Sequence, residues 1–357
     1  MDKTLLAAVI TISLLGIFFV FSASSQRGTD GPVISQIVIK QAIWIFAGLA
    51  VMVLIANSDY RRSMDFAPIF YLVILVLLVF LLMLGGERFG AKRWIGLGFF
   101  SIQPSEFVKL AVILVLSGLL RARKERARSL GNFVLALALV APAFLLIFKQ
   151  PDLGTAMILV PVVYAVLFVS GENIKYMMTT IILGLISTPL FWNLLKGYQK
   201  SRLMVFLNPN LDPLGAGYTI IQSKIAIGSG GFLGKGWLHG TQSQLKFLPE
   251  RHTDFIFSVI GEEWGFAGAI VLLLLYAIVV ARGVRIISGT DDIFGKGVVT
   301  GIVTLFAVQV VVNISMTIGL MPVVGFPLPL ISYGGSSAIV FLVGTGLMLS
   351  VSRQRVR

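Results

Sequence analysis

The sequence contains no cysteine and almost no histidine. Its 357 residues include two histidines, His239 and His252. Disulfide bonds and thiol chemistry are therefore excluded, and a zinc site, which usually needs several such ligands, is not expected. No phosphate-binding Walker loop or dinucleotide fingerprint occurs either. An enzyme built from this chain would have to work with carboxylates, basic groups and backbone amides.

Charged residues are also scarce. They make up 13% of the chain, whereas hydrophobic residues make up 57%, a balance that excludes a soluble domain of this length. A helix needs about 20 apolar residues to cross roughly 30 Å of hydrocarbon. Backbone groups in lipid must bond internally, which allows only helices or a closed barrel. Runs such as YLVILVLLVFLLML do not alternate in polarity, so helices are favoured.

The fold class that follows is an all-α polytopic membrane protein with ten transmembrane helices. We treat residues 1–357 as one transmembrane domain, in which residues 196–253 form a large structured extracellular loop between spans seven and eight. The ten predicted spans lie near residues 5–24, 37–56, 67–84, 106–120, 132–148, 154–170, 176–195, 254–281, 297–320 and 336–352.

The distribution of lysine and arginine predicts the orientation. With the N-terminus inside, 15 of the 29 basic residues lie inside, five of them in residues 121–128. Of the other 14, seven fall in the long loop, where charge has little influence on orientation. We therefore expect both termini in the cytoplasm. The first span could be a signal peptide, but its apolar stretch is long for one, and an uncleaved helix is favoured.

The net charge of +13 has two interpretations. Nucleic-acid binding would require a basic surface with interleaved aromatic residues or a known motif, and neither is present. Basic cytoplasmic loops that meet anionic membrane lipid explain the charge better. We expect membrane lipid and no nucleic acid among the partners.

The first polar stretch is GGERFGAKRWIGLGFFSIQPSEFVK, residues 85–109. Pro104 suits the first turn of a helix, and Glu106 is favoured there by the helix dipole. Glu106 and Lys109 are three residues apart and can pair along the helix. The pair could line the interior of the bundle, as intramembrane charges usually do, or mark an interfacial helix start. Arg88, Lys92 and Arg93 could receive an anion or belong to a solvated loop.

Two further stretches interrupt the apolar pattern. In KQPDLGTA, residues 149–156, Asp152 could cap the sixth span or line a polar cavity. In MPVVGFPLPLISYGGSS, residues 321–337, three prolines and three glycines rule out a regular helix. Such backbone at membrane depth requires surrounding protein or a water-filled cavity. Free N–H groups at Gly334, Gly335 and Ser336 could bind an anion, or simply begin a capped helix.

The long loop is rich in glycine but contains one helical pattern. In GYTIIQSKIAIG, Tyr218, Ile221 and Ile225 share a helical face, which predicts an amphipathic segment lying on the membrane surface. Loops of this length are usually functional.

The stretch LPERHTDFIFSVIGEEWGF, residues 248–266, places acidic residues at the start of an apolar helix. On a helix counted from Asp254, Ser258 and three glycines fall on one narrow face, which is typical of a groove or close packing. Glu262 falls at the margin, roughly 12 Å deeper, and Glu263 on the opposite side. Asp254 is then the carboxylate that substrate can reach, unless it is a helix N-cap. Glu262 and Glu263 are expected to hold helices together by buried pairing.

Four blocks carry a resemblance to a known family. FLPERHTDFIFSVIGEEWGF, PLPLISYGGSS, QPSEFVK and QPDLGTA resemble the signature blocks of the SEDS family (shape, elongation, division and sporulation). The resemblance covers essentially the whole chain, and GWLHGTQSQLKFLPERHTDF is more similar to the elongation member than to the division member. It implies an inner-membrane peptidoglycan glycosyltransferase that polymerises lipid II together with a class B penicillin-binding protein and other proteins of the elongation machinery.

The resemblance also implies that Asp254 is the essential acidic residue. The donor is an α-linked lipid diphosphate and the product linkage is β, which calls for an in-line attack assisted by a base. Asp254 is assigned as that base, or as the ligand of a divalent cation, Mg²⁺ or Mn²⁺, that orients the reacting groups. The residues expected to hold phosphate are Lys109, Arg93, Lys246, Arg251 and the Gly334–Ser336 turn. His252 could contact substrate or be structural.

Two other functions remain open at this point. Broken helices and charges within the membrane are features of transporters, and a flippase for lipid-linked sugars is the alternative. The polar groups gather at one face, however, whereas a transport pathway needs them on both. A scaffold for the penicillin-binding protein would have no use for a polar cavity.

Overall fold

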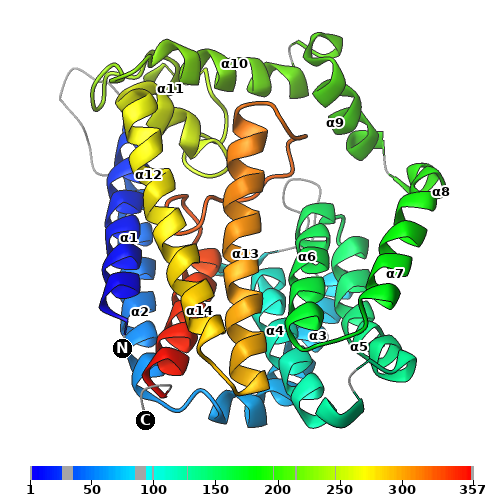
Figure 1. Ribbon diagram of the computed structural model, residues 1–357. Coiled ribbons are helices and arrows are strands. Elements are labelled where there is room, and N and C mark those ends of the chain that lie inside the picture. Colours follow the sequence, from blue (N-terminus) through cyan, green and yellow to red (C-terminus); the bar gives the residue numbers. More distant parts are fainter. Residues whose placement is uncertain are drawn as a thin grey trace.

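The computed structural model describes residues 2–25, 35–84, 94–98, 100–126, 128–195, 197–213, 215–245 and 247–354. Within these ranges the protein is almost entirely helical (Figure 1). The long helices are α1 (Lys3–Ser24), α2 (Gln36–Asn57), α3 (Arg62–Leu84), α4 (Pro104–Ala122), α5 (Leu130–Lys149), α6 (Leu153–Val169), α7 (Ile174–Ile186), α12 (Ile256–Ser288), α13 (Ile293–Thr317) and α14 (Gly335–Gln354). The shorter ones are α8 (Thr188–Leu194), α9 (Gly197–Leu207), α10 (Ala216–Ser229), α11 (Thr241–Gln244) and the 3₁₀ turns η1 (Lys124–Arg126) and η2 (Pro209–Leu211).

Seven described helices are long and apolar enough to cross a membrane. They are α1, α2, α3, α5, α12, α13 and α14. The protein is therefore a polytopic membrane protein. The other three predicted spans fall on helices that are too short or too charged for this criterion: α6 has 17 residues, α7 has 13, and α4 carries three charged residues, Glu106, Lys109 and Arg121.

The predicted span near residues 176–195 falls on two consecutive helices, α7 and α8, rather than one. The chain leaves the helix after Ile186 and starts α8 at Thr188, with Pro189 in its first turn. Proline has no N–H to donate and clashes with the preceding turn, so an uninterrupted helix through this point is disfavoured. Helices α7 and α8 lie at the outer edge of the bundle (Figure 1).

The interior consists of two apolar clusters. One joins α1, α2, α12, α13 and α14 and includes Ile12, Ile45 and Phe341. The other joins α3 to α6 and includes Leu78, Phe133 and Leu159. Helix α4 contributes to both, with Ile113 facing the first cluster and Val112 the second. It therefore connects the two halves of the bundle.

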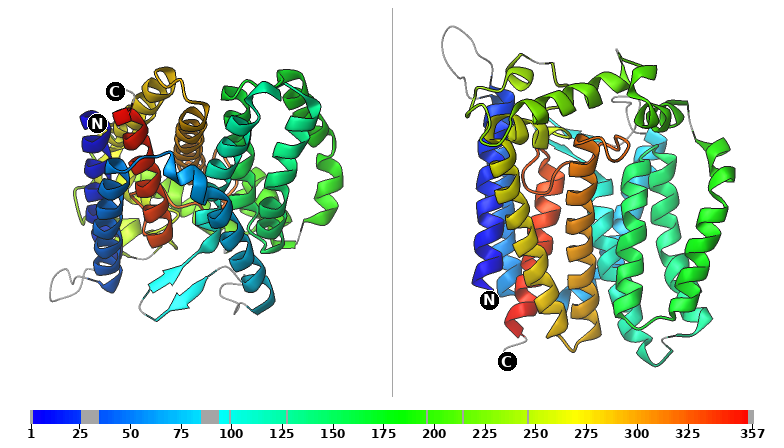
Figure 2. Two further views of the ribbon diagram at one scale, coloured as in Figure 1. Left: turned by 90° about the horizontal axis from the view of Figure 1, so that it is seen from below. Right: turned by 45° about the horizontal axis from the view of Figure 1, so that its top comes forward.

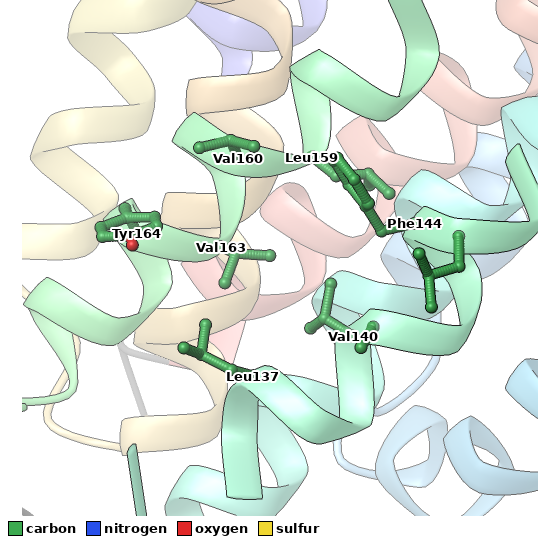
Figure 3. A pocket seen from close by; sticks show the side chains of 9 residues that line it. Leu137, Val140, Phe144, Leu159, Val160, Val163 and Tyr164 are labelled. Atoms are coloured by element: carbon green, nitrogen blue, oxygen red, sulfur yellow. The ribbon is translucent and has the colours of Figure 1, made fainter. Parts of the chain in front are cut away.

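A groove of about 260 Å³ lies between α5 and α6 (Figure 3). Its lining includes Leu137, Phe144, Val160 and Tyr164, and none of the lining residues is charged. The groove therefore lacks the groups that acid–base chemistry requires.

A β-hairpin departs from the predicted all-α fold. Strand β1 (Ile95–Leu97) pairs with β2 (Phe100–Ile102) in antiparallel register, with Ile95 opposite Ile102. The hairpin projects sideways from the bundle (Figure 2, left). It lies directly before α4 and leads the chain into Pro104.

The helices α9, α10 and α11 lie together at the end of the bundle opposite to the start of α1 and the end of α14 (Figure 1). Helix α10 forms as expected, and a face other than the predicted apolar one packs against the bundle. Ile220, Ser223 and Ala226 are buried, whereas Ile225 is 45% exposed. The reason is a polar contact: Ser223 Oγ lies 2.6 Å from Ser258 Oγ and donates to the backbone oxygen of Thr317 at 2.6 Å. This bonding turns Ser223 inward.

Helix α12 is broken at Gly265, which corrects the prediction of one straight helix from Asp254. Gly265 has φ 65° and ψ −160°, a backbone conformation essentially restricted to glycine. The depth and angles counted along a straight helix therefore do not apply beyond this residue.

The glycine-rich part of the loop fills the break. Lys235 N and Gly236 N donate to the oxygens of Glu262 and Glu263, each at 3.0 Å. Phe266 N and Ala267 N donate to the oxygens of Gly231 and Phe232, also at 3.0 Å. Backbone groups freed by the break are thus paired with residues 231–236, as a low-dielectric environment requires.

Candidate active site

Asp254 lies in the turn that precedes α12, outside the spanning helix. The N-cap position of α12 is Phe255, so the alternative that Asp254 caps this helix is wrong. Its backbone oxygen accepts a hydrogen bond from Asn313 Nδ2 of α13 at 2.9 Å. The same amide donates to the oxygen of Phe326 at 2.5 Å. Asn313 therefore ties the Asp254 turn to the segment between α13 and α14.

This segment, residues 318–334, contains most of the predicted non-helical stretch 321–337: residues 321–334 lack helix as predicted, whereas α14 already begins at Gly335. We call it the 318–334 segment. Side chains from several helices hold its backbone: Gln309 donates to Pro327 O at 2.9 Å, Tyr276 to Pro329 O at 2.8 Å and Gln41 to Ser332 O at 3.1 Å. Buried polar backbone is stable only when it is paired in this way.

The 318–334 segment is also bonded directly to the residues before α12. Tyr333 N donates to His252 O at 2.8 Å, and Ser332 Oγ donates to Thr253 O at 2.5 Å. A Cβ atom added to Gly325 would lie 3.2 Å from Asp254 Oδ2, and Gly325 has a φ of +79°. The carboxylate therefore faces a glycine backbone, and the two segments form one structural unit.

The surroundings of Asp254 raise its pKa. Removal from solvent is the largest cause, the negative charge of Glu250 adds to it, and the positive charge of Arg202 opposes it, with the result that the pKa of Asp254 is raised to about 7. The residue as a whole is half-buried. A carboxyl group with a pKa near neutrality can both accept and release a proton at cellular pH.

Glu106 and Lys109 form the ion pair that their spacing predicted. Lys109 Nζ lies 2.7 Å from both carboxylate oxygens and donates to Gln309 Oε1 at 3.3 Å. The side chains are 5% and 0% exposed. Lys109 is thus held inside the bundle, and in this conformation its ammonium does not reach a surface where phosphate could bind.

Asp152 is the N-cap of α6, one of the two predicted alternatives. Its Oδ1 accepts from Thr155 N at 3.2 Å and its Oδ2 from Thr155 Oγ1 at 3.0 Å. Gln103 Nε2 also approaches Oδ2, at 3.5 Å. The aspartate therefore connects the start of α6 to the residue before α4.

The turn at the start of α14 is bonded to neighbouring protein groups. Gly334 N donates to Gln41 Oε1 at 3.3 Å, and Ser336 Oγ accepts from Gln103 N at 2.9 Å. A Cβ atom on Gly335 would lie 2.2 Å from Trp44 Nε1. The anion-binding role of this turn stays a prediction, and these contacts assign it a packing role.

Arg251 and His252 flank the site in different ways. Arg251 is buried, donates to the oxygens of Ala23, at 2.5 Å, and Ser243, and its pKa is lowered by desolvation. It holds the end of α1 against the loop. His252 is half-buried, packs its ring 6.0 Å from that of Tyr333, and has a pKa lowered mainly by desolvation. Two predicted phosphate ligands, Arg93 and Lys246, lie outside the described residues.

The carboxylates of α12 have different partners, as their different angular positions on the helix predicted. Glu262 accepts from Lys235 Nζ at 2.9 Å and from the backbone N–H groups of Gln242 and Ser243. Glu263 accepts from Ser22 Oγ of α1 at 2.6 and 2.7 Å. Glu262 therefore anchors the loop and Glu263 anchors α1, while Ser258 bonds α10 through Ser223.

Known proteins identify the fold and the family. Residues 2–357 match the sequence profile that covers FtsW, RodA and SpoVE and is described as "Cell cycle protein". The chain belongs to the FtsW/RodA/SpoVE family.

Relatives within this family match the chain over almost its full length. The peptidoglycan glycosyltransferase MrdB of Escherichia coli (strain K12) is 42% identical, over 99% of this chain and 94% of that protein. Stage V sporulation protein E of Bacillus subtilis (strain 168) is 40% identical, over 98% and 96%. The peptidoglycan glycosyltransferase RodA of Treponema pallidum is 34% identical, over 99% and 98%.

Solved structures of FtsW/RodA/SpoVE proteins share the fold. A chain of a peptidoglycan synthase complex, in a structure described as showing coordination of polymerization and crosslinking, has a TM-score of 0.82 at 35% identity. RodA of Thermus thermophilus has a TM-score of 0.74 at 31% identity. Both cover 100% of this chain and are themselves covered to 98%.

Arg202 is the site residue that the sequence reasoning missed. It lies on α9 and donates from Nη1 to the oxygen of Val323, in the 318–334 segment, at 3.2 Å. Its charge acts on the carboxyl group of Asp254. No local motif marks it, because it lies 52 residues before Asp254 in the glycine-rich loop. Only the placement of α9 next to the 318–334 segment brings it into the site.

Proposed function

We propose that this protein is a peptidoglycan glycosyltransferase that polymerises lipid II into glycan strands for cell elongation. One observation carries the proposal: the half-buried Asp254 faces the backbone of Gly325 between two bonded polar segments of a membrane protein, and its pKa is raised to about 7. Its membership of the FtsW/RodA/SpoVE family and its full-length similarity to peptidoglycan glycosyltransferases support the same activity.

The chemistry required of Asp254 is that of a general base. The 4-hydroxyl of the acceptor sugar attacks C1 of the donor sugar from the side opposite the diphosphate, which inverts the configuration. As the new C–O bond forms, Asp254 takes the hydroxyl proton. The old C1–O bond breaks and its electron pair stays on the diphosphate oxygen. The protonated carboxyl group then returns its proton to solvent.

Charge develops on the leaving diphosphate, and Arg202 is the cation that we assign to it. Guanidinium groups bind phosphate oxygens through two parallel N–H donors. Arg202 donates one hydrogen bond from Nη1 to Val323 O. Its positive charge also acts on the carboxyl group of Asp254. Preorganised donors of this kind stabilise charge that appears in the transition state.

A divalent cation is the second role that we considered for Asp254. The described residues bring together no group of three or more histidine, cysteine, aspartate or glutamate side chains. The protein would supply Asp254 as the carboxylate ligand, and Mg²⁺ or Mn²⁺ would complete its coordination with water and substrate phosphates, as Mg²⁺ commonly does. Bound there, a cation would neutralise charge on the diphosphate. We favour the base role because it needs one carboxylate.

We further propose that the protein crosses the bacterial inner membrane ten times, with both termini in the cytoplasm and Asp254 facing the periplasm. Support comes from the excess of basic residues in the short loops on the N-terminal side. The start of α1 and the end of α14 lie at one end of the bundle and α9 to α11 at the other (Figure 1), which is the arrangement that an even number of crossings requires.

The proposed partner is a class B penicillin-binding protein that crosslinks the new strands, together with other elongation proteins. The support is the similarity to a chain of a peptidoglycan synthase complex in which polymerization and crosslinking are coordinated. The similarity to RodA of Thermus thermophilus, described as a rod shape determining protein, supports a role in elongation.

The test is polymerisation by the purified protein. The protein, alone and with its penicillin-binding partner, is incubated with lipid II in detergent and a divalent cation, and glycan strands are measured. We expect strands from the wild type and from Asp291→Ala, whose exposed carboxylate lies before α13, but none from Asp254→Ala. Normal polymerisation by Asp254→Ala would refute the base assignment. If neither the wild type nor any variant polymerises lipid II, but the wild type moves lipid II across vesicle membranes, the protein is a flippase.

A further inference from the structure

The turn formed by residues 231–237 presents large apolar side chains outward. Phe232 is 68% exposed and Leu233 is 76% exposed, and Trp237 is 40% exposed. Surface apolar residues are common singly, but a contiguous group marks an interaction surface. We call this group the 231–237 turn.

The backbone of this turn is rigidly placed. It fills the break in α12 through the four backbone hydrogen bonds described above, and Gly234 N also donates to Gly230 O at 2.8 Å. A Cβ atom on Gly234 would lie 2.1 Å from Glu263 O, so the turn lies directly against the helix. Its exposed side chains are therefore held outward by fixed backbone.

The apolar surface of the turn continues into the membrane-spanning part of α12. The ring of Phe232 lies 6.0 Å from that of Phe266, the first residue after the break. Phe266 is 59% exposed, and the exposed side chains of α12 then follow at helical spacing: Ile270, Leu273, Leu274 and Ile278. On a spanning helix such a stripe faces lipid. The turn extends that stripe beyond the end of the helix.

The sequence around the turn matches a lipid surface rather than a protein surface. Residues 213–249 contain no aspartate or glutamate and three lysines, Lys224, Lys235 and Lys246. Contact with lipid would therefore bury no carboxylate of this segment, and burying one would be costly. Trp237 stacks on Phe18 of α1 with ring centroids 4.6 Å apart, and tryptophan is enriched where protein meets the membrane interface.

We propose that the 231–237 turn inserts Phe232 and Leu233 into the bilayer beside α12, so that the loop is anchored in lipid next to the active site. The turn lies between the two halves of α12, and the first half begins two residues after Asp254. Lipid contact at the turn thereby supports the position of the catalytic turn. The inference concerns lipid contact alone and holds whether or not Asp254 is the base.

The absence of cysteine from the sequence makes a direct test simple. Single variants Phe232→Cys and Leu233→Cys are spin-labelled in the full-length protein, which is reconstituted without a partner in bilayers containing anionic lipid. Relaxation by oxygen, which partitions into lipid, is compared with relaxation by a water-soluble nickel complex. Leu274→Cys on α12 is the lipid control, and Asn210→Cys in η2 is the exposed control.

We expect the oxygen-to-nickel ratio at both positions to approach that of position 274 and to exceed that of position 210 several-fold. A ratio equal to that at position 210 would overturn the proposal. A lipid-like ratio that disappears when the penicillin-binding partner is added would also overturn it, because the turn would then be a protein-docking surface. Phe232→Cys removes the ring contact with Phe266 and could fail to fold for that reason. In that case Leu233→Cys, which removes no such contact, decides the question.

Discussion

Asn313 joins Asp254 to the 318–334 segment, donating from one amide group to the backbone oxygens of Asp254, at 2.9 Å, and Phe326, at 2.5 Å. The backbone of the turn at Asp254 is thus bonded to α13, a largely buried helix. The same amide therefore fixes the distance between the Asp254 backbone and the 318–334 segment.

The activity is expected to rise with pH through about 7. Asp254 must be ionised to accept a proton, and its pKa is raised to about 7. The ionised share then grows about tenfold between pH 6 and pH 8, and polymerisation rates of the wild type should follow it. A rate that is flat over this range, measured under single-turnover conditions, would exclude Asp254 as the base.

Asp254→Asn should be more stable than the wild type at pH 8. The folded pKa lies above the ordinary value of 3.8, so the stability contributed by this carboxyl group is greatest below that value and is lost as pH rises through about 7. The amide removes the cost of burying a charge. Thermal unfolding at pH 8 measures the difference, which should vanish near pH 4.

Arg202→Gln should lower the polymerisation rate about 100-fold, the loss typical of one donor to a developing oxyanion. Arg202→Lys should recover part of it. Lys200→Gln is the matched control: Lys200 lies two residues away on α9 with its ammonium 5.9 Å from the ring centre of Trp192, and its change should leave the rate within about twofold. Equal losses of polymerisation rate in Arg202→Gln and Lys200→Gln would show that the rate depends on the total charge of α9 and not on a specific contact of Arg202.

Single changes in the Glu106–Lys109 pair should destabilise the protein more than the double change. Glu106→Gln or Lys109→Met leaves one buried charge unpaired, at a cost of about 3–5 kcal/mol, whereas the double variant leaves none. Thermal midpoints in detergent provide the comparison. Arg121→Gln breaks a more exposed pair with Asp292, which is 3.5 Å long, and should cost about 1 kcal/mol or less. If the double variant lost the sum of both single losses, the pair would not act as a unit.

Gly265→Ala should displace the loop and abolish activity. The backbone there requires glycine, and the new Cβ would lie 2.4 Å from Gly234 N. Gly171 provides the control, because its φ is +83° but no atom lies within 4 Å of an added Cβ. Gly171→Ala should cost only the backbone strain, about 1–2 kcal/mol. Activity of Gly265→Ala equal to that of Gly171→Ala would show that the break is not needed.

The parts of the fold that depend on local composition could be predicted from the sequence. Apolar runs locate the long helices, and the prolines and glycines of residues 321–337 predict the non-helical stretch that contacts Asp254. The Glu106–Lys109 pair and the Asp152 cap follow from spacing within one turn of helix. These features depend on residues that are close together in the chain.

The parts that depend on distant partners could not be predicted. An isolated glycine within an apolar helix is ordinarily tolerated, and Gly265 is a break only because the N–H groups and carbonyls it frees meet residues 231–236. The buried face of α10 follows from the bond between Ser223 and Ser258, and Arg202 enters the site through the position of α9. The phosphate role of Lys109 was predicted without knowledge of its enclosure by Glu106 and Gln309.

The hydrogen bonding across the break at Gly265 limits how this protein can be recombined with its relatives. Residues 231–236 and 262–267 supply donors and acceptors to each other in both directions, so neither stretch is complete alone. A chimera that takes residues 231–236 from one parent and residues 262–267 from another would lose this matched bonding, so both stretches should come from the same parent. The natural crossover points are therefore upstream of α10 and downstream of Ala267, and the loop and helix between them are inherited as a single module.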